Sequence, residues 1–360
     1  MKWSWRIGQL AGIGIYMHAT FLILLVWVGT ASYFINHSMA DVVTGITFIC
    51  LLFFIVVLHE LGHALAARRY GVQTRDITLL PIGGLARLEK MPEKPWEEFV
   101  VAIAGPLVNV ALAALFFLVA ALIPDLTLRQ ELNFLEGNIF VSLFWVNVIL
   151  AVFNMIPAFP MDGGRVLRSL LAMGMDYVQA TRIASTIGQM VAFIFGFIGL
   201  LIFHPFLILI AVFVWIGATQ EARMVEIKTV LSDVMVSNVM ISHFETLSPE
   251  DTLERAIEHI LEGFQQDFPV IEDNKVIGVL TRSDLLKALH EKGKDVPVRD
   301  VMHTTFEQAS PFEKAEKVFA RLQDCECRSV PVVVDERIVG IVTMDHLGEY
   351  LMIRNALKDR

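Results

Sequence analysis

Residues 55–65, IVVLHELGHAL, place two histidines and a glutamate inside an otherwise apolar run that extends from residue 42 to residue 67. About 20 apolar residues are enough for a helix to cross the hydrocarbon core of a bilayer. Ionisable side chains are costly at that depth and usually serve a function. The stretch therefore predicts a membrane helix that carries chemistry.

The spacing of the polar residues indicates the kind of chemistry. His59 and His63 are four residues apart, so both imidazoles lie on one face of the predicted helix and can bind one Zn²⁺. Glu60 can act as general base on the attacking water without binding the metal. Zinc lowers the pKa of water and polarises a scissile carbonyl. A chance match to H-E-x-x-H is the alternative, and the absence of other charges in this run makes it weak.

Composition divides the chain in two. The 360 residues are 55% hydrophobic with a mean hydropathy of +0.59, which is too apolar for an ordinary soluble protein. Residues 1–225 hold 13 basic and 13 acidic side chains, whereas residues 226–360 hold 16 and 25. We expect a polytopic α-helical membrane domain over 1–225 and an acidic cytosolic domain over 226–360. Without a basic patch to neutralise phosphates, nucleic-acid binding is not expected.

Apolar runs predict about six transmembrane helices, at residues 15–35, 42–67, 99–123, 139–157 and in the two halves of 183–218. The last run is too long for one span, and His204-Pro205 near its middle predicts a tight turn. Lys and Arg gather on alternate connections, which places both termini in the cytoplasm by the positive-inside rule. The predicted location is the cell membrane, with several passes.

A zinc site of this kind needs a third protein ligand and an open position for water. Asp162 is the candidate, because the P-A-F-P segment at 157–160 interrupts the fourth predicted span and two glycines after Asp162 permit a turn toward a buried metal. Taken alone, the segment also fits a helix end with an Asx turn on the cytoplasmic side. The histidine motif favours the ligand.

Three motifs on successive predicted spans resemble the site-2 proteases, the zinc metalloproteases of regulated intramembrane proteolysis. They are H-E-L-G-H at 59–63, A-G-P-L-V-N at 104–109, and N-x-x-P at 154–157 running into Asp162-Gly163. The resemblance covers roughly residues 8–217.

This resemblance implies one Zn²⁺ held by His59, His63 and Asp162, with Glu60 as catalytic base. It also implies cleavage of a peptide bond within or near a transmembrane segment of the substrate. Asn154 matches an asparagine that lies close to the catalytic centre in the family, in substrate contact or oxyanion stabilisation. Residues 78–85, TLLPIGGL, look like the family's re-entrant hairpin, whose strand edge can capture an unwound substrate. A plain cytoplasmic loop is the alternative.

Three short segments of the second half recur at offsets of 67, 62 and 62 residues, which predicts a duplicated small α/β module. The repeats, at about 230–290 and 298–353, resemble a tandem pair of CBS motifs that pack as one Bateman module. The resemblance implies that adenine nucleotides, ATP or AMP, bind between the repeats and that the chain forms a homo-oligomer. A purely structural or dimerising module is the alternative.

The family's nucleotide signature is G-h-h-[ST]-x-x-[DN]. Gly278, Thr281 and Asp284 match it, with Thr281 at a phosphate and Asp284 at the ribose. In the second repeat Asp345 comes one residue early and His346 takes its place, so one competent nucleotide site is expected.

The sequence thus favours a zinc intramembrane protease that acts on a transmembrane protein in the lipid bilayer and is modulated through its CBS pair. A non-proteolytic CBS-regulated membrane transporter or scaffold is the alternative, but it leaves the H-E-x-x-H motif unexplained.

Overall fold

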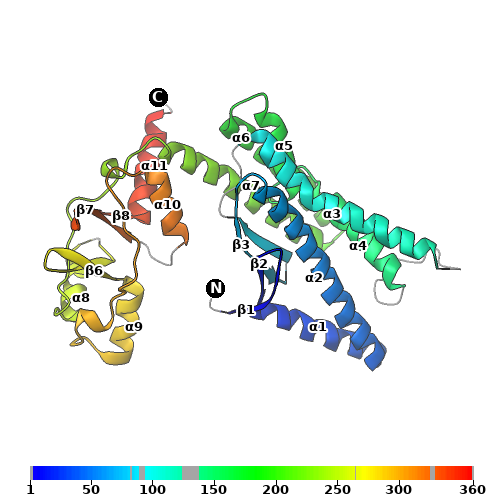
Figure 1. The fold of residues 1–360 in the computed structure, drawn as a ribbon, viewed down its shortest axis with the longest axis horizontal. Helices are drawn as coiled ribbons and strands as arrows, with labels where there is room; N and C mark the ends of the chain where they lie inside the picture. Colours follow the sequence, from blue (N-terminus) through cyan, green and yellow to red (C-terminus); the bar gives the residue numbers. More distant parts are fainter. Residues whose placement is uncertain are drawn as a thin grey trace. The chain divides into compact units, whose positions relative to one another are not determined.

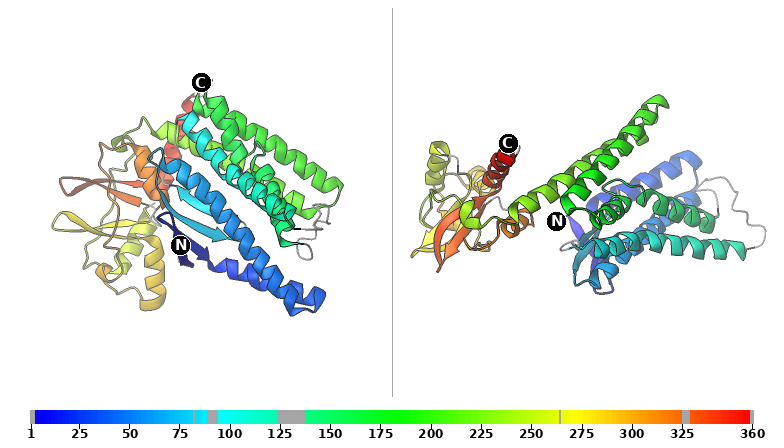
Figure 2. Two further views of the ribbon diagram at one scale, coloured as in Figure 1. Left: turned by 45° about the vertical axis from the view of Figure 1, so that its right-hand side comes forward. Right: turned by 90° about the horizontal axis from the view of Figure 1, so that it is seen from above.

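The computed structural model describes residues 3–81, 83–88, 94–123, 138–263, 265–324 and 329–358. The chain forms two compact units, Met1–Arg223 and Met224–Arg360. Each unit is described by itself below, and Figures 1 and 2 show the ribbon.

The first unit is mainly helical. α3 packs against α2, α4 and α5, and it therefore lies at the centre of this unit's helices (Figure 1). The helices are α1 (Ala19–Asn36), α2 (Met39–Arg68), α3 (Pro95–Ala121), α4 (Ile139–Asn154), α5 (Asp162–Ala172), α6 (Tyr177–Leu201) and α7 (Pro205–Leu231).

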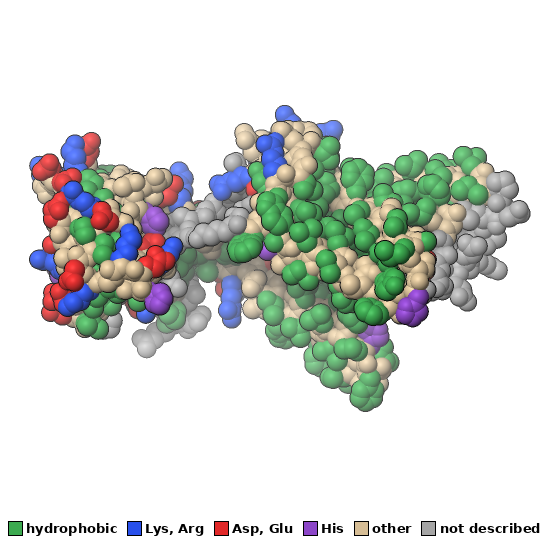
Figure 3. Space-filling model, turned by 90° about the horizontal axis from the view of Figure 1, so that it is seen from below, with side chains coloured by type: hydrophobic (Ala, Val, Ile, Leu, Met, Phe, Trp, Pro, Cys, Tyr) green, Lys and Arg blue, Asp and Glu red, His purple; other side chains and the backbone are tan. Residues whose placement is uncertain are grey.

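Four of the described helices are long and apolar enough to cross a membrane: α2, α3, α6 and α7. The apolar helices at residues 19–35 and 139–154 are shorter, so the count of about six spans stays a prediction. The turn predicted at His204-Pro205 is confirmed, because α6 ends at Leu201 and α7 begins at Pro205. In Figure 3 hydrophobic side chains cover most of the visible face of the first unit, whereas charges of both signs dominate the second.

A four-stranded sheet joins the beginning of the chain to the segment after α2. Its strands follow the order β1 (Ser4–Leu10), β2 (Ile13–His18), β3 (Thr74–Leu80) and β4 (Gly83–Leu88). β2 and β3 are parallel, and the two outer pairs are antiparallel. β3 and β4, the second outer pair, form a hairpin where the sequence predicted one, at residues 78–85. Ile82 lies outside the described residues.

The sheet corrects the predicted beginning of the first span, because residues 15–18 belong to β2 and not to a helix. Ala11 and Gly12 both have positive φ, which fits a tight turn between antiparallel strands. Ile13 and Ile15 are buried, while Gly14 between them is less so, as expected for the alternating faces of a strand. α1 then begins at Ala19, where the His18 ring accepts a hydrogen bond from the Thr20 backbone N–H.

The second unit repeats one pattern of helix, two-stranded antiparallel hairpin and helix. Both hairpin turns contain two consecutive non-glycine residues with positive φ, at 273–274 and at 335–336, and these pairs lie 62 residues apart. Each repeat has its own apolar core. The first repeat contains α8 (Leu253–Glu262), β5 (Phe268–Glu272), β6 (Lys275–Leu280) and α9 (Arg282–Lys292), and the second contains α10 (Ala315–Asp324), β7 (Ser329–Val334), β8 (Arg337–Thr343) and α11 (Met344–Lys358). Single 3-10 turns, η1 (Val236–Asn238) and η2 (Val298–Asp300), occupy equivalent places.

Candidate metal centre

Three buried side chains converge where α2 meets the start of α5. Nε2 of His59 and Nε2 of His63 lie 3.1 Å apart, and each lies 3.1 Å from Oδ2 of Asp162. In a tetrahedral site with metal–ligand bonds of about 2.0–2.1 Å, ligand atoms lie roughly 3.3 Å from one another. The spacing therefore fits a zinc ion bound by three protein ligands.

In both imidazoles the N–H group is at Nδ1, the ring nitrogen that faces away from Asp162. Nδ1 of His63 lies 2.7 Å from the backbone carbonyl oxygen of Val101, which can only accept a hydrogen bond. Nδ1 of His59 contacts the side-chain oxygen of Asn109. Both Nδ1 atoms are therefore donors, and both Nε2 atoms direct lone pairs toward the Asp162 carboxylate. Three acceptors at this spacing fit a cation between them.

Gly105 keeps the space between the ligands open. A Cβ atom on Gly105 would lie 2.2 Å from Nε2 of His63 and 2.7 Å from Nε2 of His59. The shorter distance is close to that of a zinc–nitrogen bond, about 2.0–2.1 Å. A methyl group at position 105 would thus occupy the space that the ion needs.

α3 also supplies the groups that orient the imidazoles. Asn109 contacts His59, and its amide nitrogen donates to Oδ1 of Asn147 on α4 at 3.1 Å. Both asparagines are fully buried. Partners of this kind fix the ring and the tautomer of a metal-binding histidine. The sequence contained the motif around Asn109, but the roles of Asn109, Asn147 and the Val101 carbonyl depend on helix packing and were missed.

A buried ion pair fixes the helix that carries Asp162. Arg168 on α5 donates hydrogen bonds to Glu98 on α3 and, at 2.6 Å, to Glu221 on α7. Burial lowers the pKa of the Arg168 guanidinium, but the two carboxylates raise it by more, so the group stays charged. The guanidinium also lies 5.0 Å from the ring centroids of Phe159 and Tyr177. α5 is therefore tied to α3, the helix that orients both histidines.

Gly163 and Gly164 lie in the first turn of α5, so the turn predicted directly after Asp162 is wrong. A Cβ on Gly163 would lie 2.2 Å from the carbonyl oxygen of Ile156. A Cβ on Gly164 would lie 2.6 Å from the backbone nitrogen of Phe159. The two glycines are needed because the segment after α4 packs directly on the start of this helix.

β4 passes beside the candidate base. Glu60 is half-buried, and a Cβ on Gly84 would lie 3.0 Å from its Cγ and 2.8 Å from Cγ1 of Val56. β4 is also one of the two edge strands of the described sheet, with β1 at the other edge. The hairpin predicted at residues 78–85 therefore packs on α2 at Glu60.

Asn154 is the last residue of α4 and is half-buried. Among the residues that the structure describes, the asparagine in contact with a ligand side chain is Asn109. The role predicted for Asn154 stays a prediction.

The residues predicted to bind a nucleotide lie together where β6 meets α9. Oγ1 of Thr281 accepts a hydrogen bond from the backbone N–H of Asp284 at 3.2 Å, and the two side chains also bond each other. Oδ2 of Asp284 lies 2.8 Å from Nε2 of His303. A Cβ on Gly278 would lie 2.7 Å from Sδ of Met302, so close packing requires this glycine.

Comparison with known proteins identifies the family of each unit. The sequence model of peptidase family M50 matches residues 47–137 and 136–202, and the CBS domain model matches residues 236–291 and 298–353. A zinc metalloprotease of Methanocaldococcus jannaschii is 35% identical over 302 residues, which is 84% of this chain and 83% of the relative. A relative from Synechocystis is 31% identical over 327 residues, which is 85% of this chain and 82% of the relative. The solved structure of a site-2 protease from M. jannaschii is 40% identical, covers 61% of this chain and 95% of that chain, and gives a TM-score of 0.45.

The chain therefore belongs to peptidase family M50 and carries a pair of CBS domains. It is a site-2 protease-like zinc metalloendopeptidase. Family membership implies Zn²⁺, and the three convergent acceptors of the buried cluster fit that ion.

Proposed function

We propose that this protein hydrolyses a peptide bond within or near a transmembrane segment of a membrane-bound substrate. The observation that carries the proposal is the buried cluster of His59, His63 and Asp162. Two of its members lie on α2, a helix long and apolar enough to cross a membrane. A hydrolytic site at that place acts on chains that are themselves in the bilayer.

In this proposal His59, His63 and Asp162 hold Zn²⁺. The ion, when bound, acts as a Lewis acid toward the scissile carbonyl and the attacking water. Glu60 takes a proton from that water and returns it to the leaving amide nitrogen. Asn154 contacts the substrate close to the scissile bond or stabilises its oxyanion.

The substrate segment must unwind before cleavage, because a helical amide is shielded by its own hydrogen bonds. β4 supports a way to hold the substrate segment unwound, since it is an edge strand of the sheet and packs on α2 at Glu60. An extended segment added to β4 gains backbone hydrogen bonds in place of those it loses. We infer that β4 presents the scissile bond to the site.

We also propose a multi-pass protein of the cell membrane, with a catalytic domain over 1–225, about six transmembrane helices and both termini in the cytoplasm. Support comes from Arg68 and Arg69 at the end of α2, since basic residues favour the cytoplasmic side. His63 precedes them by five residues, or roughly 7–8 Å of helix rise, so cleavage falls near the cytosol.

We propose that the CBS pair, residues 226–360, modulates the protease by binding ATP or AMP at Gly278, Thr281 and Asp284 or by holding a homo-oligomer. Support comes from the position of Thr281 and Asp284 at the N-terminus of α9, where backbone N–H groups favour a phosphate. His303 adds an imidazole whose Nε2 lies 2.8 Å from Oδ2 of Asp284.

The test compares membranes from cells that express the wild type, Glu60→Gln or the matched control Glu97→Gln. Glu97 is the half-buried partner of the exposed Lys94 at the start of α3. Quantitative proteomics should find new peptide ends inside transmembrane segments with the wild type and the control, and uncut substrates with Glu60→Gln. Equal cleavage by all three would remove the proposed mechanism, and no cleavage by any would favour the transporter or scaffold alternative.

A further inference from the structure

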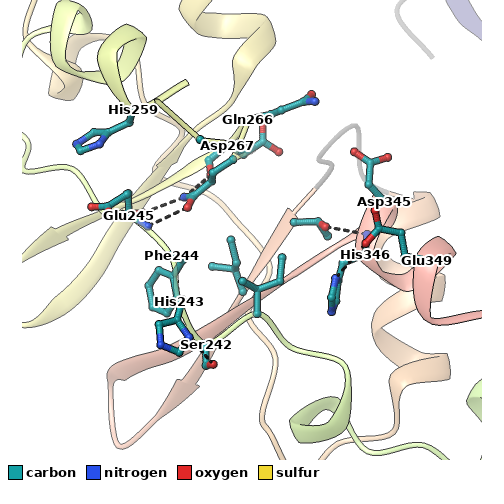
Figure 4. Close-up of a pocket in the computed structure, with 15 residues that line it drawn as sticks. Ser242, His243, Phe244, Glu245, His259, Gln266, Asp267, Asp345, His346 and Glu349 are labelled. Atoms are coloured by element: carbon teal, nitrogen blue, oxygen red, sulfur yellow. Dashed lines mark hydrogen bonds and ion pairs between the residues drawn. The ribbon is translucent and has the colours of Figure 1, made fainter. Parts of the chain in front are cut away.

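Unbalanced charge occurs in both units. In the second unit, carboxylates line a cavity of about 830 Å³ between the two repeats. Figure 4 shows Glu245 and Asp267 on one side of this cavity and Asp345 and Glu349 on the other. The cavity belongs to the CBS pair, so its lining bears on the modulation proposed above. In the first unit the unbalanced charge is positive and lies beside the metal centre, at Arg165.

Arg165 is a half-buried cation on α5. It follows Asp162 by three residues, so the two side chains leave the same side of the helix. Within the described residues its side chain has no hydrogen bond and no ion pair, whereas Arg168, one turn later, has both with Glu98. A partly buried charge without a partner is unfavourable, because it has lost some of its water and gained no compensating contact. The guanidinium is therefore available to a group that arrives with a ligand.

Arg165 is also close to the proposed catalytic base. Its positive charge acts on the carboxylates of Glu60 and Glu98. Glu60 is the residue on which β4 packs through Gly84. A substrate segment that is added to β4 and presented to Glu60 therefore lies near the guanidinium.

The direction of α5 shows which part of the substrate this is. Farther along the helix, Arg168 bonds to Glu98 in the first turn of α3 and to Glu221, two residues before the end of the first unit. In the topology proposed above, these ends of α3 and α7 face the cytosol. Arg165 lies between Asp162 and Arg168, so it meets the substrate on the cytosolic side of the scissile bond.

An unpaired arginine at this place favours one kind of substrate side chain. A guanidinium binds a carboxylate through two parallel hydrogen bonds and repels Lys and Arg. Arg165 is already partly desolvated in the folded protein, so pairing costs less than it would for an exposed arginine. Transmembrane segments commonly carry Lys and Arg on their cytosolic side. A preference for the opposite charge would therefore exclude many membrane proteins as substrates.

We propose that Arg165 determines substrate specificity by pairing with an Asp or Glu that the substrate carries on the cytosolic side of the scissile bond. It discriminates against Lys and Arg at that position. The inference rests on the intramembrane cleavage proposed above and adds a class of substrate to it. Arg165 neither holds the metal nor moves a proton, so zinc binding does not depend on it.

The test maps new peptide ends in membranes from cells that express the wild type, Arg165→Gln, Arg165→Glu or the matched control Arg69→Gln. Arg69 is exposed at the C-cap of α2, so the control loses the same charge beyond the end of that helix. With the wild type and the control, Asp and Glu should be enriched on the cytosolic side of cleaved bonds, relative to uncut transmembrane segments. Arg165→Gln should lose this enrichment, and Arg165→Glu should favour Lys and Arg instead.

Purified protein in detergent gives the size of the effect. The substrate is the segment most strongly cut in the membranes, made in two versions with Glu or Gln at the enriched position. For the wild type, kcat/KM should be about tenfold higher with Glu, mainly through KM, whereas Arg165→Gln should cut both versions alike. Arg165→Lys keeps the charge and should retain part of the preference. Every variant should hold as much zinc as the wild type, which shows that it is folded.

The outcomes separate this inference from the proposed function. An acidic preference that persists in both charge variants, or cleavage by the wild type without such a preference, would overturn the inference and leave the protease in place. Equal slowing of both versions by Arg165→Gln would also overturn it and would favour pairing of Arg165 with a lipid phosphate. No cleavage by the wild type would remove the proposed function and this inference with it.

Discussion

Nδ1 of His63 lies 2.7 Å from the carbonyl oxygen of Val101, so the backbone of α3 fixes the ring of one candidate zinc ligand. Gly105 lies one turn later against both imidazoles, and Asn109 lies one further turn along at His59. Residues four apart share a helix face. One face of α3 therefore sets both the orientation of the histidines and the space between them.

Gly105→Ala should abolish zinc binding while the protein still folds, because the new methyl group takes the place of the ion. The measurement is bound zinc per chain by mass spectrometry after purification. Gly174→Ala is the matched control, since the nearest atom to a Cβ there is at an ordinary 3.9 Å. Normal zinc content in Gly105→Ala would show that the ion lies elsewhere.

Asn109→Ala should lower zinc affinity about 10–100-fold, because His59 loses the acceptor that fixes its ring. Competition with a chelator of known affinity measures this change. Asn138→Ala removes the N-cap of α4 and serves as control, since it does not contact either histidine in the described structure. An affinity equal to that of the wild type would contradict the role given to α3.

Arg168→Met should destabilise the first unit by about 3–5 kcal/mol, because it leaves Glu98 as a buried carboxylate without its partner. Thermal unfolding in detergent measures the change. The double variant Glu98→Gln with Arg168→Met should recover much of the stability, since the uncompensated charge is gone. Equal loss in the single and double variants would mean that packing, rather than the ion pair, accounts for the effect.

The residues whose chemistry is local in sequence were predictable. His59, Glu60 and His63 were chosen from their spacing in one helix. Asp162 was chosen from the prolines before it and the glycines after it, although those glycines continue α5 and do not form the predicted turn. The duplicated α/β module of the second unit was also accessible, because its segments recur in the residue pattern. Each of these signals can be seen in the order of the residues without knowing how distant segments pack.

Features that depend on packing between distant segments were not predictable. The bond between His63 and Val101 joins residues 38 positions apart, and that between Arg168 and Glu98 joins residues 70 apart. Residues 15–18 of β2 were taken for part of a helix because they run directly into the apolar stretch that follows, and pairing with β3 is what distinguishes the strand. Likewise, the cavity beside Asp345 depends on how the two repeats pack.

Removing zinc should lower the temperature of unfolding, because the ion binds the folded site and not the unfolded chain. At a free zinc concentration about 100 times the Kd, the stabilisation is about 2.7 kcal/mol. Chelated protein titrated with zinc should therefore unfold at rising temperature, and His63→Ala should show no rise. A rise of equal size in His63→Ala would place the stabilising ion outside the cluster.

The central claim is that His59, His63 and Asp162 hold one zinc ion and that Glu60 acts as the catalytic base beside it. Bound zinc per chain, measured on the wild type, Asp162→Ala and Glu60→Gln purified in parallel, tests it most directly. The account predicts one ion in the wild type and in Glu60→Gln, and none in Asp162→Ala. An Asp162→Ala protein that retains its zinc would contradict it.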